Sequence, residues 1–115
     1  MATRSRIAVE LPDGKVKSVY CQWDGYPSGV GKDLLKRGFN STREVEEFID
    51  EGDRSTVDLS YNEWRGEDCP PLEHNSAEEF FNSDIEEYGY LYTIKGEWIV
   101  KGQYQPVNGL LENQI

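Results

Sequence analysis

The 115-residue sequence has few of the residues on which disulfide frameworks, zinc sites and most catalytic centres depend. It contains two cysteines, Cys21 and Cys69, which form no C-x-x-C pair, and a single histidine, His74. These residues are too few for a disulfide framework or for zinc ligands of recognisable spacing. We expect His74 to lie in an exposed acidic loop with no nucleophile beside it. The sequence therefore predicts no catalytic residues, no metal and no cofactor.

The chain also lacks long apolar runs and an excess of basic residues. No stretch approaches the roughly 20 apolar residues that a bilayer-spanning helix needs. Residues 1–6 lack the apolar segment of a signal peptide, so we expect a cytoplasmic protein with reduced thiols. The net charge of −10 repels nucleic acid and anionic membranes, and neither is an expected partner.

The acidic residues are concentrated in the middle of the sequence. Residues 1–43 carry a net charge of +4, residues 44–87 a net charge of −14, and residues 88–115 none. A basic protein partner is the functional interpretation of this distribution, and simple solubility is the alternative. The acidic residues that we assign to partner binding are Glu46, Glu47, Asp50, Glu63, Glu67, Asp68, Glu78 and Glu79.

Alternation of apolar and polar residues with period 2 predicts two β-hairpins. The first spans residues 1–23 around a turn at residues 12–14, where Gly14 accepts a positive φ. The second spans residues 88–100 around a tight turn at Lys95 and Gly96. A further short strand is indicated by Val57, Leu59 and Tyr61.

Two capping boxes predict helices that begin after Ser41 and after Ser76, each with a glutamate three residues later. A third short helix is expected between Ser28, as its N-cap, and Gly38. Together the elements predict an α+β fold: a small antiparallel sheet of about four strands, made of two hairpins, with two or three short helices packed on one face. We expect a single domain over residues 1–105 and a frayed tail over residues 106–115.

The stretch of residues 25–35 contains glycines and a lysine before apolar residues, as phosphate-binding loops do. Gly31 and Lys32 match the central pair of a P-loop, but Tyr26 replaces the first glycine and Asp33 replaces the hydroxyl residue. We therefore interpret this stretch as a turn between a strand and a helix. A module that sequesters a small nucleotide on strand aromatics, or a minor enzyme, is the alternative function; the phosphate ligands would be Arg4, Arg6 or Lys32.

The sequence SVYCQWDGYP of residues 18–27, with residues 5–7 before it, resembles a family of small uncharacterised bacteriophage proteins. Members of that family typically contain a Y-C-H-W-D-G-Y-P segment, a glycine-containing turn and a Leu-Leu helix. Residues 87–92 and Trp98 are similar to the aromatic hairpin near the end of the family. Gln22 replaces the usual histidine, which argues against a metal or catalytic role for the segment.

The resemblance implies expression in an infected bacterium, and therefore a location in the cytoplasm of the host. Small acidic phage proteins often act by binding a host factor. We accordingly expect a non-enzymatic accessory protein that binds and inhibits a host nuclease, polymerase or defence component through an acidic surface resembling nucleic acid. We also expect Tyr20 and Trp23 to be buried anchors. The residues of this signature segment are Tyr20, Trp23, Asp24, Gly25, Tyr26 and Pro27.

Overall fold

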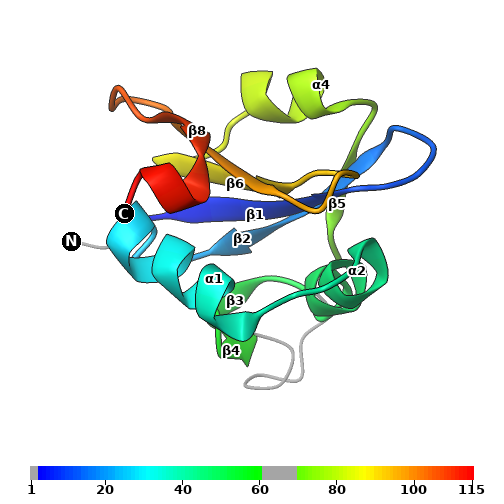
Figure 1. The fold of residues 1–115 in the computed structure, drawn as a ribbon, viewed down its shortest axis with the longest axis horizontal. Helices are drawn as coiled ribbons and strands as arrows, with labels where there is room; N and C mark the ends of the chain where they lie inside the picture. The colour runs from blue at the N-terminus through cyan, green and yellow to red at the C-terminus, as the bar shows by residue number, and fades with distance from the viewer. Residues whose placement is uncertain (1–2, 61–69) are drawn as a thin grey trace.

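The computed structural model describes residues 3–60 and 70–115, which form one eight-stranded mixed sheet with helices on both faces (Figure 1). The strands follow the order β4-β3-β2-β1-β6-β7-β8, and β5 pairs with β2 beside β3. The strands are β1 (Ser5–Glu10), β2 (Val16–Cys21), β3 (Arg54–Thr56), β4 (Leu59–Ser60), β5 (Leu72–His74), β6 (Tyr88–Tyr92), β7 (Trp98–Gly102) and β8 (Asn108–Leu110).

Both predicted hairpins are present, as β1–β2 and β6–β7. The prediction of a four-stranded antiparallel sheet is nevertheless wrong. The two hairpins join through parallel pairing of β1 with β6, and β2 pairs in parallel with β3 at its end. A hairpin is specified by its own turn and by the alternation of apolar and polar residues in its strands. The pairing between two hairpins depends instead on distant contacts, here between Ser5 and Tyr88, which are 83 residues apart.

The helices cover both faces of the sheet, whereas the sequence predicted them on one. Helices α1 (Lys32–Arg37) and α2 (Thr42–Asp50) pack on one face, and α4 (Ala77–Asn82) packs on the other (Figure 1). Strand β1 consequently has no solvent-facing side: Ile7 and Val9 join the core beneath α1 and α2, while Ala8 joins the core beneath α4. Its alternation predicts a half-buried strand, but a central strand between two layers is buried on both sides.

The helix caps follow the sequence closely. Ser41 Oγ accepts a hydrogen bond from Glu44 N at 3.2 Å, and Ser76 Oγ accepts one from Glu79 N at 3.0 Å, so both predicted serine N-caps are confirmed. Each glutamate accepts in return from the residue before the cap, Asn40 N or Asn75 N. Gly38 ends α1 in the left-handed conformation with a φ of 64°. The apolar stripe predicted for α2 is buried as expected.

The chain after residue 105, for which the sequence predicted a frayed tail, contains a strand and a helical turn. Strand β8 pairs with β7, and a turn of 3-10 helix, η2 (Leu111–Asn113), buries Leu111. The expected strand at residues 57–61 is also wrong in its bounds: Val57 lies between β3 and β4, and Tyr61 lies outside the described residues. No helix in the described ranges has the length and apolarity that crossing a membrane requires.

Candidate functional site

The segment that follows β2 is a tightly fixed loop, which we call the signature loop (residues 22–31). Asp24 adopts a positive φ of 58°, which is costly for a residue with a side chain. Asp24 O accepts a hydrogen bond from Val30 N at 2.7 Å, and Gly25 N donates one to Thr3 O at 2.9 Å. The buried Tyr90 hydroxyl donates to Gly25 O from beneath the loop. Several independent contacts therefore hold one strained loop conformation.

Gly25 is required at its position by close packing rather than by its φ. A Cβ at residue 25 would lie 2.9 Å from Thr3 O and 3.0 Å from Arg4 O, which are backbone atoms. Pro27 then opens a short π-helical turn, η1 (Pro27–Gly31), that leads into α1. The sequence predicted Ser28 as the N-cap, and this prediction is wrong. Tyr26 occupies the N-cap position of the turn and makes no side-chain capping hydrogen bond. The stretch that resembles a phosphate loop is thus helical at Gly31 and Lys32.

The signature loop exposes its aromatic rings. Trp23 is 46% exposed and Tyr26 is 39% exposed, so the prediction that Trp23 is a buried anchor is wrong. Tyr20 is half-buried rather than fully enclosed. The reason lies in the backbone: Trp23 N donates to Ser55 O at 3.0 Å at the end of the sheet, and the left-handed Asp24 then turns the chain back toward Thr3. The ring of Trp23 remains in solvent.

Tyr26 borders a hollow of about 180 Å³, which we call the tyrosine hollow. Tyr104, which is 78% exposed, comes from the segment after β7, and Tyr88 begins β6. Sequence reasoning did not single out Tyr104, although its polar neighbours Gln103 and Gln105 are typical of a surface position. The hollow is lined by Thr3, Tyr26, Glu87, Tyr88, Tyr104 and Gln105.

Carboxylates and a second strained residue surround the tyrosine hollow. Glu86 has a φ of 63°, and together with Asp24 it completes the set of described non-glycine residues with positive φ. Arg4 joins the two neighbouring glutamates: its Nε lies 3.7 Å from Glu86 Oε2, and its backbone N donates to Glu87 Oε2 at 2.6 Å. The Tyr26 hydroxyl donates to Asp24 Oδ1 at 3.2 Å, and this hydrogen bond raises the pKa of Tyr26. Strain, exposed rings and negative charge therefore meet at one end of the sheet.

The acidic residues assigned to partner binding are divided between two faces of the molecule. Glu46, Glu47 and Asp50 lie on α2, whereas Glu78 and Glu79 lie on α4 across the sheet (Figure 1). The other three, Glu63, Glu67 and Asp68, lie outside the described residues.

Several of these acids have partners within the protein. Lys17 Nζ lies 3.2 Å from Glu46 Oε2 and also pairs with Asp50, while Arg43 pairs with Glu47 at 3.2 Å. The two acidic side chains of Glu46 and Asp50 therefore anchor α2 to the sheet through Lys17. Glu79 is engaged as well, because its carboxylate accepts hydrogen bonds from Asn75. Glu47 and Glu78 are exposed, and among residues 3–60 and 70–115 neither connects its helix to the sheet or caps a helix.

A buried polar cluster lies beneath α4, where the sequence predicted an exposed histidine. His74 is only 8% exposed, and its Nε2 lies 2.8 Å from Ser18 Oγ. Arg6 Nε donates to the same oxygen at 3.0 Å, and Arg6 Nη2 donates to Ser18 O at 3.0 Å. Burial and the Arg6 charge lower the pKa of His74, and burial lowers that of Arg6. The pairing of Ser18 with His74 resembles a nucleophile with its base, but Ser18 is completely buried and the cluster lines none of the hollows described here.

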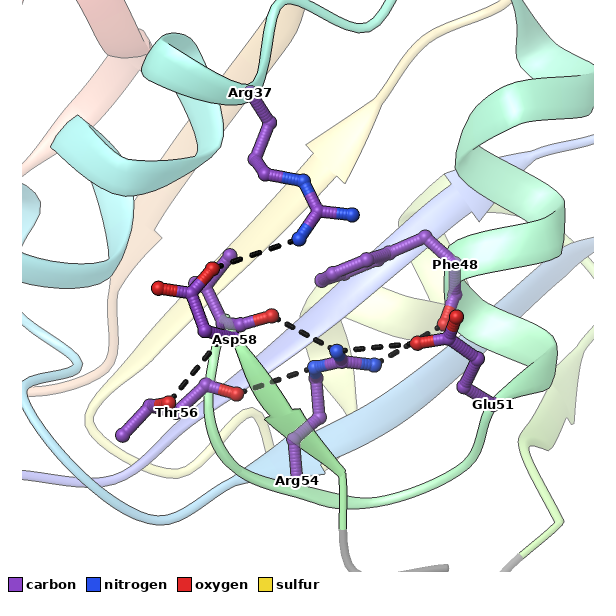
Figure 2. Close-up of polar contacts among 7 residues, drawn as sticks. Arg37, Phe48, Glu51, Arg54, Thr56 and Asp58 are labelled. Atoms are coloured by element: carbon purple, nitrogen blue, oxygen red, sulfur yellow. Dashed lines mark hydrogen bonds and ion pairs between the residues drawn. The ribbon is translucent and has the colours of Figure 1, made fainter. Parts of the chain in front are cut away.

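Arg54 forms a second buried centre, between α2 and the β3–β4 turn (Figure 2). Its guanidinium donates to the carbonyl oxygens of Phe48, Thr56 and Val57 at 3.3, 3.2 and 2.8 Å, and pairs with Glu51 at 3.2 Å. Its Cζ lies 4.0 Å from the centre of the Phe48 ring. Burial lowers the pKa of Arg54. Every one of these contacts is internal, so Arg54 fastens α2 to the loop after it.

The remaining chemical groups give no open reactive centre among the described residues. Burial raises the pKa of the Cys21 thiol to about 11, so it is a neutral thiol at physiological pH. The described residues contain no group of three or more side chains that could hold a metal ion. The strand aromatics Tyr90, Tyr92 and Trp98 belong to the core, so they form no open stacking face for a nucleotide base. Comparison of the chain with protein families, curated proteins and solved structures gives no match.

Proposed function

We propose that this protein is a non-enzymatic binding protein whose contact surface is centred on the signature loop and the tyrosine hollow. The observation that carries the proposal is that a strained, many-fold anchored loop holds Trp23 and Tyr26 in solvent. Tryptophan and tyrosine dominate the energetic centres of protein interfaces. Because the backbone of the loop is already fixed, binding loses little backbone conformational freedom, which favours affinity.

The chemistry around the rings favours a partner with a basic surface. Asp24, Glu86 and Glu87 flank the aromatic residues, and the whole chain has a net charge of −10. Such a field accelerates the approach of a positively charged protein and repels nucleic acid. The acids on α2 and α4, led by Glu47 and Glu78, contribute to this long-range attraction rather than to a single continuous contact.

The biological setting follows from the resemblance of residues 18–27 to small bacteriophage proteins. On that basis the partner is a protein of the bacterial host, and binding inhibits it in the host cytoplasm. A nuclease, a polymerase or a defence component would offer the basic surface, since each is built to contact nucleic acid. A binding role is favoured over catalysis because the Ser18–His74 pair is closed to a substrate.

The proposal is tested by capture from bacterial lysate with tagged protein at low and high salt. Trp23→Ala and Tyr104→Ala should each weaken binding of the captured protein, by about 30-fold in Kd for a central interface residue. Tyr104→Ala should keep the melting temperature because Tyr104 is 78% exposed, whereas Trp23→Ala should lower it slightly because Trp23 is only 46% exposed. Ile94→Ala is the matched control, since Ile94 is 50% exposed at the opposite end of β6. Capture that is equal for wild type, Trp23→Ala and Tyr104→Ala would refute the proposal.

Charge-reversal variants distinguish long-range electrostatic attraction of the partner from direct contact with it. Glu47→Lys on α2 and Glu78→Lys on α4 should each slow association at low salt and leave dissociation unchanged. Because the two helices lie on opposite faces, the larger effect identifies the face that the partner approaches. Association rates that are independent of salt and of both reversals would show that charge plays no part.

A further inference from the structure

A separate pocket lies between α1, the turn after β6 and the β8–η2 segment. Its volume is about 210 Å³, below the range of roughly 300–1,000 Å³ that drug-sized ligands occupy. The wall contains three aromatic residues, Phe39, Tyr92 and Trp98, with ring centres 5.2 Å apart for Tyr92 and Trp98 and 6.0 Å apart for Phe39 and Trp98. The size and the lining restrict any occupant to a small group that is compatible with aromatic rings.

The same wall carries negative charge that has no internal partner. Glu97 and Glu112 are exposed and line the pocket, and the lining contains no lysine, arginine or histidine. Within the described part of the chain, neither carboxylate forms an ion pair. This contrasts with α2, where Lys17 and Arg43 neutralise the acids. Two unpaired carboxylates at the rim of an aromatic pocket attract a cation.

A third observation is an unused polar atom in the wall. Tyr92 is 3% exposed, and its hydroxyl makes no hydrogen bond with any described residue. That hydroxyl lies 3.4 Å from the position that a Cβ would occupy at Gly96, another residue of the pocket wall. The Tyr92 hydroxyl oxygen is not among the fully buried polar atoms, so a ligand or a water molecule in the pocket can reach it. It can accept a hydrogen bond from an O–H or N–H group of a ligand inside the pocket.

From these features we infer that this pocket binds an alkylammonium group. Aromatic residues in a pocket wall attract an organic cation electrostatically, and carboxylates at the rim add Coulombic attraction. The Phe39 ring already contacts one cation within the protein, because Arg37 Cζ lies 5.6 Å from the ring centre. Arg37 itself is held by Asp58 at 3.5 Å and does not line the pocket, so the pocket is left for an external ammonium group. This site is distinct from the tyrosine hollow and does not depend on the function proposed for it.

The experiment is a titration of the full chain with choline at constant ionic strength, followed by NMR of the Trp98 indole N–H. We expect a saturable shift of that resonance. The neutral carbon analogue of choline, 3,3-dimethylbutan-1-ol, has nearly the same shape without the charge and should bind much more weakly. Nε-trimethyllysine amide in a second titration distinguishes a free ammonium ligand from a modified lysine side chain, and binding of either compound supports the inference.

Charge-neutralised variants complete the test. Glu97→Gln/Glu112→Gln should weaken choline binding about fivefold, since an exposed ion pair contributes modestly. Glu73→Gln/Glu78→Gln removes the same charge from exposed positions away from the pocket and should leave the affinity unchanged. The inference is overturned if Trp98 shows no saturable shift with either cation. It is equally overturned if the neutral alcohol binds as well as choline, or if the two double variants behave alike.

Discussion

Replacement of Arg54 by lysine should destabilise the protein severely although it preserves the charge. The guanidinium serves three carbonyl oxygens and Glu51 at once, and a lysine ammonium cannot present donors in that planar arrangement. Hydrogen bonds to charged groups contribute about 1.5–3 kcal/mol each, and we expect lysine to retain at most one of the three carbonyl contacts. The loss of two predicts a decrease of about 3–6 kcal/mol in the free energy of unfolding, and the weakened Phe48 ring contact adds to this decrease.

That decrease is a large part of the roughly 5–15 kcal/mol by which small domains are stable. It is measured by urea denaturation monitored by circular dichroism, with the transition midpoint compared between wild type and Arg54→Lys. Arg43→Ala is the control, because the Arg43 side chain is 88% exposed and its pair with Glu47 should contribute less than about 1 kcal/mol. If Arg54→Lys unfolds within about 1 kcal/mol of wild type, the buried guanidinium does not fasten α2 as described.

Two further predictions concern His74 and Gly25. Burial lowers the pKa of His74, so below about pH 6.5 the unfolded chain binds a proton that the folded protein does not bind. The free energy of unfolding should therefore decrease as the pH is lowered, by at most about 1.4 kcal/mol per pH unit. In urea denaturation between pH 7.5 and 5.5, this dependence should be weaker in His74→Gln, and parallel curves for the two proteins would contradict it. Gly25→Ala should cost about 1–3 kcal/mol because its Cβ meets the backbone of Thr3 and Arg4. Gly14→Ala is the comparison, because Gly14 has a φ of 88° but open space around it. In thermal unfolding Gly14→Ala should lower the stability less than Gly25→Ala does, and the reverse order would show that the signature loop can shift to accept a Cβ.

The sequence predicted those parts of the fold that depend on neighbouring residues. The capping serines Ser41 and Ser76 each find their donor three residues away, and each hairpin depends on its own turn. The parallel joining of β1 and β6 was not predictable in the same way, because nothing in either strand specifies its neighbour. The placement of α4 on the second face follows from this pairing, since it leaves Ala8 and Leu91 to be covered.

The sequence singled out the signature segment, but the prediction that Trp23 is buried was wrong. A tryptophan in a small aromatic-rich domain is expected in the core, whereas Trp23 follows the end of β2, precedes the left-handed Asp24, and is 46% exposed. The Ser18–His74 contact joins residues 56 positions apart and has no local signal. Charge counting along the chain likewise could not show that Lys17 neutralises Glu46 and Asp50, because Lys17 comes from β2.

The pairing of β1 with β6 also determines when the chain can fold during its synthesis. Ser5 lies beside Tyr88, so the central strand gains its second neighbour only after residues 88–92 have left the ribosome. Closing so long a loop has a high entropic cost, and sheets rich in such distant pairings fold on a timescale of about milliseconds to seconds rather than microseconds. A nascent or truncated chain that ends before residue 88 contains the first hairpin and the helices α1, α2 and α4, but it leaves the backbone edge of β1 that pairs with β6 without a partner strand. Such a chain is a target for chaperones and proteases until residues 88–115 have been made.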